Sequence, residues 1–123
     1  MIVVIDDERT FEFTDTAVYA RTSQEAISRL ANTAILFDQV PIGAIGEITQ
    51  MFFDHDLGED SEADGVVVAR FVGILVRGCP DLFRGCKFYI HSQNPVGAKN
   101  IFDALKFYGI DAQVIPLPPL KKD

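Results

Sequence analysis

Short apolar runs alternate with longer helix-forming segments along this chain of 123 residues. The runs predicted to be strands, which are rich in β-branched and aromatic residues, are 1–6, 16–20, 50–54, 86–92 and 112–116. The segments predicted to be helices are 22–32, 65–76 and 94–109. Because helices connect successive strands, this order predicts an α/β domain of three layers, with a mostly parallel five-stranded sheet and helices on both faces.

Two of the helix-forming segments carry clear start signals. Thr22 and Glu25 have the spacing of a capping box. Asn94 suits a helix cap, and Pro95 suits the first turn that follows it. The stretch 33–50 contains glycine and proline, so we expect an irregular or partly helical connection there.

Composition and charge narrow the class of protein. A hydrophobic content of 48% argues for one folded domain over residues 1–123. The formal net charge of −7 disfavours binding to long double-stranded nucleic acid, whereas a small phosphate ligand needs only a local positive field. With no long apolar run and no leader, we expect a soluble, cytoplasmic protein without a membrane partner. In that compartment Cys79 and Cys86 are expected to stay reduced.

The only two histidines, His55 and His91, each stand where a predicted strand gives way to polar residues. In open α/β sheets, ligands bind outside the carboxyl ends of the strands. Acidic residues follow the same strands, so groups far apart in sequence are expected to share one edge. That edge is predicted to hold Asp6, Asp7, Asp54, His55, Asp56, His91 and Ser92.

The residue types at this edge suit phosphate chemistry. Histidine titrates near neutral pH, so His55 and His91 are candidate acid and base groups around a phosphodiester; the alternative is that either one orders a loop. Hard carboxylate oxygens suit a divalent ion, above all Mg²⁺, which bridges to phosphate; their alternative is to cap loops and helices. The candidate metal ligands are Asp7, Asp54, Asp6 and Asp56, with Asp6 expected to support Asp7 and Asp54.

A second set of residues is suited to holding a phosphate. The candidates are Arg9, Ser92, Gln93, Asn94 and Lys99. Arg9 can clamp a phosphate bidentately or pair with the neighbouring acids. The turn at Asn94 begins a helix, whose free amides and dipole favour an anion. Ser92 offers a hydrogen bond, while Lys99 either adds charge or is simply solvated.

Four motifs carry a family resemblance. They are "DDER" (6–9), "FDHDLG" (53–58), the Asp64-Gly65 step and "HSQNPVGAKNI" (91–101). They resemble the cyclic-phosphate processing receiver domain, a family related to response-regulator receiver domains. The resemblance covers nearly the whole chain except about 33–47, which looks longer than usual.

The resemblance implies a receiver-like, flavodoxin-like fold and the processing of a cyclic phosphate. The implied enzyme is a phosphoesterase acting on a cyclic nucleotide or on an RNA 2′,3′-cyclic phosphate end, and a phosphorylated small molecule or an RNA end is the expected partner. In receivers an acidic pair and a strand-end aspartate hold Mg²⁺. The residues that would carry the catalysis here are His91, His55 and Asp54.

Two alternatives stay open. In a signalling receiver, Asp54 would accept a phosphoryl group. Such domains normally carry a lysine at the end of the fifth strand, whereas this strand ends at Pro116 and no lysine follows until Lys121. The third possibility is a non-catalytic module that binds a nucleotide or a protein partner through the same edge.

Overall fold

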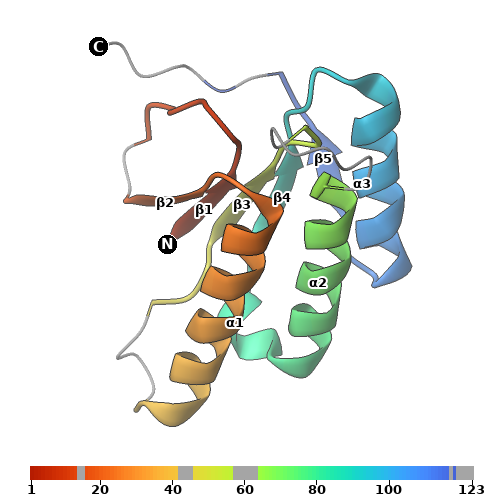
Figure 1. Ribbon diagram of the computed structural model, residues 1–123. Coiled ribbons are helices and arrows are strands. Elements are labelled where there is room, and N and C mark those ends of the chain that lie inside the picture. Colours follow the sequence, from red (N-terminus) through yellow and green to blue (C-terminus); the bar gives the residue numbers. More distant parts are fainter. Residues whose placement is uncertain (14–15, 42–45, 57–63, 117, 119–123) are drawn as a thin grey trace.

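The computed structural model describes residues 1–13, 16–41, 46–56, 64–116 and 118. Its elements follow one another from β1 near the amino terminus to β5 (Figure 1). They are β1 (Ile2–Ile5), β2 (Ala17–Ala20), α1 (Ser23–Gln39), β3 (Gln50–Phe53), α2 (Asp64–Gly78), the 3₁₀ helix η1 (Pro80–Phe83), β4 (Lys87–Ile90), α3 (Pro95–Phe107) and β5 (Ala112–Val114). The sequence analysis predicted all of these except η1.

The five strands form one sheet in the order β2-β1-β3-β4-β5. Every neighbouring pair is parallel, which confirms the α/β class and the receiver-like sheet. In the register of the three central strands, Ile5 lies opposite Phe53, and Phe53 lies opposite Ile90. The residues that follow these three positions are therefore level with one another at the carboxyl edge.

The three helices pack on one face of the sheet, which corrects the expectation of helices on both faces. Each helix-containing connection steps across the sheet in the same direction, and right-handed crossovers in one direction place all their helices on the same face. Figure 1 shows α1 and α2 side by side in front of the strands. One core cluster joins strand residues to Ala26, Leu30, Val68, Val72, Ile101 and Leu105 of the helices.

In the described parts of the chain, no helix covers the second face. A smaller cluster lies there, formed by buried Ile2, Val4, Phe11 and Phe52 with partly buried Phe13, Tyr19, Tyr89 and Ile115. Phe11 and Phe13 come from the segment that links β1 to β2. The connection between the first two strands therefore covers part of the sheet itself.

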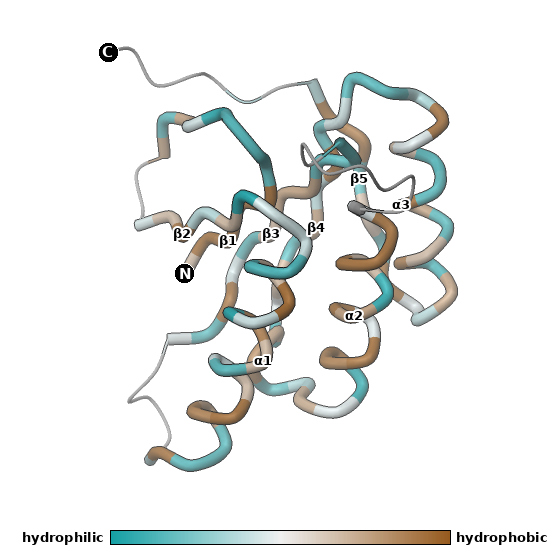
Figure 2. The backbone as a smooth tube through the Cα atoms, in the orientation of Figure 1, coloured by the Kyte–Doolittle hydropathy of each residue, from teal (hydrophilic) through white to brown (hydrophobic). Residues whose placement is uncertain are grey.

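The apolar segment 65–76 forms a helix, α2, as predicted. This helix packs between α1 and α3, and Figure 2 shows hydrophobic residues along much of its length. Burial against two helices and the sheet explains why a segment rich in valine forms a helix, because packing overrides the weak strand preference of β-branched residues. No helix in the described ranges is both long and apolar enough to span a membrane.

The helix ends confirm the capping predictions. The Thr22 side chain accepts a hydrogen bond from the backbone N–H of Glu25 (3.0 Å), and Asn94 Oδ1 accepts one from Gly97 (3.1 Å). Helix α1 runs on to Gln39, so the first part of the stretch 33–50 is helical. Gly109, directly beyond the end of α3, has φ +79°, a backbone conformation that glycine adopts without strain.

Candidate functional site

Three of the predicted site residues meet at the carboxyl edge. Asp6, Asp54 and His91 directly follow β1, β3 and β4, and one ligand atom from each lies within 4.8 Å of the others. Because Ile5, Phe53 and Ile90 point into the helix-covered core, the next residue along each strand points to the opposite side of the sheet. All three polar side chains are buried.

Asp6 is the most heavily bonded group of this cluster. Its Oδ1 accepts hydrogen bonds from the backbone N–H groups of Glu8 (3.1 Å) and Arg9 (2.9 Å). Its Oδ2 lies 2.9 Å from Nε2 of His91. Burial alone would raise the pKa of Asp6, but the hydrogen bonds from His91, Arg9 and Glu8 outweigh it and lower the pKa to about 2.

The charge of Asp6 fixes the state of His91. An ionised carboxylate only accepts hydrogen bonds, so Nε2 of His91 carries a hydrogen and donates a hydrogen bond to Asp6. The other ring nitrogen, Nδ1, is buried and has no hydrogen-bond partner in the described structure. The His91 imidazole and the Phe11 ring pack in a T-shaped pair, with ring centroids 5.2 Å apart.

Asp54 has the opposite electrostatic environment. Burial, together with the negative charge of Asp6, raises the pKa of Asp54. Neighbouring carboxylates whose pKa values are pushed apart can take different roles in proton transfer. Asp6 is suited to remain a fixed charge, whereas Asp54 is suited to take up and release a proton.

Arg9 bridges the two carboxylates. Its Nη1 lies 3.2 Å from Oδ2 of Asp6 and 3.4 Å from Oδ2 of Asp54. The side chain keeps 21% of its surface exposed, so it is the part of the cluster nearest to solvent. The alternative considered for Arg9, an ion pair with the neighbouring acids, is what the structure contains.

Arg21 fixes the backbone that carries Arg9, and the sequence analysis missed it. Its guanidinium donates to the backbone carbonyls of Asp6 (3.2 Å) and Arg9 (2.6 Å) and to Oγ1 of Thr10 (3.1 Å). Arg21 directly follows β2, whose carboxyl end lies at the same edge of the sheet. A polar residue directly after the second predicted strand is expected at this edge for the same reason as Asp6, Asp54 and His91.

His55 lies at the same edge but outside the cluster. Asp54 points to the face of the sheet that no described helix covers, and the following side chain, that of His55, points towards α3. A Cβ on Gly97 would lie 2.4 Å from the His55 ring, so the imidazole packs directly on the first turn of that helix. Nδ1 of His55 pairs with the exposed Asp56 at 3.0 Å, and its buried Nε2 has no partner in the described structure. The shared edge therefore holds its two histidines in separate environments.

The other candidates lie around the cluster, not within it. Asp7 is half-buried and has no hydrogen bond or ion pair in the described ranges. Ser92 accepts a hydrogen bond from the backbone of Asn94 (3.2 Å), whose own side chain caps α3. Gln93 is exposed, and Lys99 pairs with Asp103 on the surface (2.6 Å). Gly58 and Lys121 lie outside the described residues.

The carboxylates offer donors that fit a divalent ion. The two carboxylate oxygens, which lie within 4.8 Å of each other and of a His91 ring nitrogen, can converge on one cation, and hard oxygen ligands suit Mg²⁺. In the structure, the guanidinium of Arg9 neutralises the same two carboxylates. A bound ion and Arg9 would therefore draw on the same oxygens.

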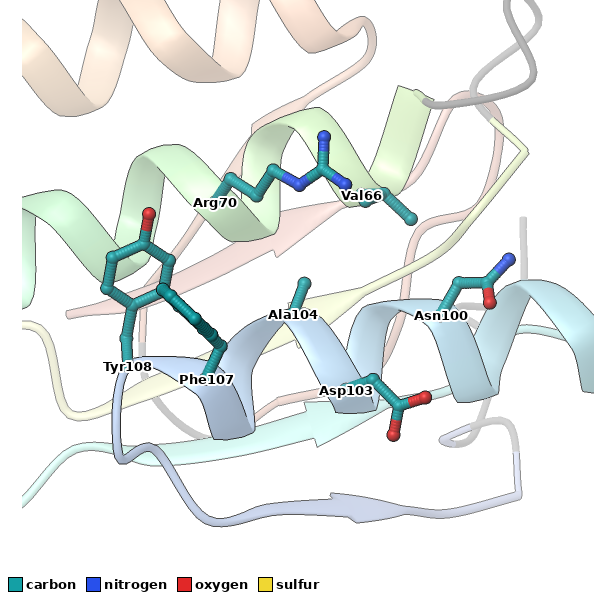
Figure 3. Close-up of a pocket in the computed structure, with 7 residues that line it drawn as sticks. All are labelled: Val66, Arg70, Asn100, Asp103, Ala104, Phe107 and Tyr108. Atoms are coloured by element: carbon teal, nitrogen blue, oxygen red, sulfur yellow. The ribbon is translucent and has the colours of Figure 1, made fainter.

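Two surface grooves lie beside α3. One, of about 730 Å³, runs between α2 and α3 (Figure 3). It is lined by Val66, Arg70, Asn100, Asp103, Ala104, Phe107 and Tyr108, none of which is a predicted site residue. The other, of about 560 Å³, lies between α3 and β5 and includes Ser92 and Lys99. The buried titratable groups, not the larger groove, mark the candidate site.

Comparison with curated proteins and with solved structures gave no match. The family model for the cyclic-phosphate processing receiver domain matches residues 1–107. That range contains the whole cluster, from Asp6 to His91, together with Arg9 and the start of α3. The sequence match, the parallel five-stranded sheet and the acidic carboxyl edge agree, and the chain belongs to the family of cyclic-phosphate processing receiver domains.

Proposed function

We propose that the protein is a phosphoesterase that hydrolyses a cyclic phosphate at the cluster of Asp6, Asp54, His91 and Arg9. The substrate class is a cyclic nucleotide or an RNA 2′,3′-cyclic phosphate end. One observation carries this proposal. Two buried carboxylates with oppositely shifted pKa values share a single guanidinium beside a buried imidazole.

The geometry supports a different role for each group. Arg9 binds a phosphate oxygen, because a guanidinium matches phosphate geometry. Asp54 removes a proton from the attacking water, because its raised pKa brings it closer to the pH of the reaction. His91, which Asp6 orients through Nε2, supplies a proton from its other ring nitrogen, Nδ1, to the ester oxygen that leaves when its bond to phosphorus breaks.

The remaining candidates support this arrangement. Asp6 holds the orientation and the charge of His91, and Asp7 stands beside it at the edge. Asp6 and Asp54 would also hold a divalent ion, with Mg²⁺ expected, and such an ion neutralises phosphate oxygens when bound. His55 and Asp56 order the turn beside α3 and take no part in proton transfer.

The two histidines provide a matched test. Turnover of 2′,3′-cyclic nucleotides and of RNA bearing that end is measured with Mg²⁺, with Mn²⁺ and with a chelator. A general acid or base contributes about 10²–10⁴-fold, so His91→Ala should lower turnover by roughly that factor. His55→Ala, at the same edge but outside the cluster, should have a much smaller effect. Full activity in His91→Ala would remove that residue from the mechanism.

The burial of both imidazoles favours a second candidate function, a non-catalytic module that binds the same ligands. His91 is 1% exposed and His55 is 8% exposed, so neither ring is open to solvent. This candidate predicts no turnover on any cyclic phosphate but measurable binding that Arg9→Ala abolishes. Calorimetric titration with a cyclic nucleotide, run beside the turnover assay, separates the two functions.

A further inference from the structure

Arg9 occupies the position that a cation between the two carboxylates would take. A single nitrogen, Nη1, contacts Oδ2 of both Asp6 and Asp54. Oxygens of these carboxylates lie within 4.8 Å of each other and of a His91 ring nitrogen. The chain thus supplies its own positive charge to a pair of buried carboxylates.

The backbone of Arg9 is held independently of its guanidinium. The Arg9 N–H donates to Oδ1 of Asp6 (2.9 Å), and the Arg9 carbonyl accepts from Arg21 (2.6 Å). These bonds do not depend on the position of the side-chain tip. Rotation about the side-chain torsions can therefore move the partly exposed guanidinium while the segment keeps its shape.

We propose that Arg9 is the resident counter-ion of Asp6 and Asp54, and that a divalent cation exchanges with it. Binding of the cation to the carboxylates releases the guanidinium, which then turns outward to a phosphate oxygen of the ligand. Like charges repel strongly in a buried setting, so the pair accommodates one cation at a time. Without either cation, two neighbouring buried carboxylates would stand uncompensated.

Removal of a residue that binds a metal normally weakens metal binding. The exchange predicts the opposite for Arg9. The incoming ion must displace Arg9, so the ion pairs of Arg9 weaken metal binding in the wild-type protein. Loss of the guanidinium should tighten metal binding. The last step, contact with a phosphate, rests on the proposed function, whereas the exchange itself needs no substrate.

The experiment measures metal binding in the absence of substrate. Wild type, Arg9→Gln, Arg9→Lys and the control Arg84→Gln are titrated with Mg²⁺ and Mn²⁺ by calorimetry. Arg84 forms an exposed ion pair with Asp81 beside η1, before β4 begins, and so lies away from the carboxyl edge. We expect Arg9→Gln to bind the ions about tenfold more tightly, which corresponds to about 1.4 kcal/mol of lost competition. Arg84→Gln should match wild type.

Thermal unfolding provides a second readout. In chelator, Arg9→Gln should melt below wild type, and added Mn²⁺ should raise its Tm by more than it raises that of wild type. If Arg9→Gln is unfolded in chelator, recovery of the fold on addition of metal is the expected result. Arg9→Lys keeps a positive charge and should bind metal no more weakly than wild type.

The outcomes separate this inference from the proposed function. Equal or weaker metal affinity in Arg9→Gln, or no metal binding by any of the four proteins, would overturn the exchange. Metal-dependent turnover together with unchanged affinity in Arg9→Gln would overturn the exchange and leave the phosphoesterase in place. Tighter binding in Arg9→Gln without turnover on any cyclic phosphate would support the exchange and count against the phosphoesterase.

Discussion

Replacement of Asp6 by asparagine tests the electrostatic centre of the site. The pKa of Asp6 falls from its ordinary value of 3.8 to about 2 in the folded protein. A depression of this size corresponds to about 2 kcal/mol of stability at neutral pH. Loss of the Asp6 charge also relieves its repulsion of Asp54, which raises the Asp54 pKa, and this relief offsets part of the loss. We therefore expect Asp6→Asn to lower the free energy of unfolding by at most about 2 kcal/mol.

The pH dependence of this contribution has a definite sign. The folded-state pKa of Asp6 is depressed, so its contribution is complete above the unfolded value of 3.8 and disappears as the pH falls through about 2. Roughly half should remain near pH 3. The difference in stability between wild type and Asp6→Asn should shrink in step.

Urea unfolding followed by circular dichroism, repeated from pH 7 down to pH 3, measures this difference. Asp7→Asn is the matched control, because Asp7 makes no hydrogen bond or ion pair in the described structure, and its stability should stay within about 0.5 kcal/mol of wild type. If Asp6→Asn unfolds at the same urea concentration as wild type at pH 7, the hydrogen bonds of Asp6 do not stabilise the fold. A difference that stays constant between pH 5 and pH 3 would likewise refute the titration argument.

Two further predictions address signalling and packing. Incubation with acetyl phosphate and magnesium should give no stable aspartyl phosphate by intact mass. Arg9 already pairs with Asp54, and the fifth predicted strand ends at Pro116, not at the lysine that signalling receivers carry there. A gain of one phosphoryl group that Asp54→Asn abolishes would favour the signalling receiver instead. Gly97→Ala should lower the melting temperature, since its Cβ would lie 2.4 Å from the His55 ring and overpacking typically costs about 1–3 kcal/mol. Gly78→Ala, with open space around its Cβ, is the control and should not lower the melting temperature.

The strand ends made the cluster predictable. Asp6, Asp54 and His91 each follow an apolar run, and parallel strands bring such positions to one edge whatever their separation in sequence. The strand register then decides which of them come into contact. Ile5, Phe53 and Ile90 are paired at the same level, so the residues that follow them lie next to one another. Register depends on packing across the whole sheet, so the motifs alone indicate the edge but not the contacts.

The side of the sheet was harder to predict. Alternation along a strand sends Asp54 and His55 to opposite sides, whereas the position of both histidines at strand ends had suggested one shared site. The placement of all three helices on one face depends on the strand order, which the order of elements along the chain does not contain. Arg21 directly follows the second strand, so its position at the edge was predictable, but its bonds to the backbone carbonyls of Asp6 and Arg9 leave no pattern in the sequence.

The connection between β1 and β2, which has no helix in its described residues, relates the placement of all helices on one face to the chemistry of the site. No helix occupies residues 6–13, so this segment folds across the carboxyl edge and onto the second face of the sheet. It brings the N–H groups that hold Asp6, the guanidinium between the carboxylates and the Phe11 ring against His91. Signalling receivers carry a lysine at the end of the fifth strand, whereas the positive charge beside Asp6 and Asp54 comes from Arg9, which follows the first strand. A helix in this connection would have carried those groups away from the edge. The charged cluster and the face that no described helix covers therefore have the same origin.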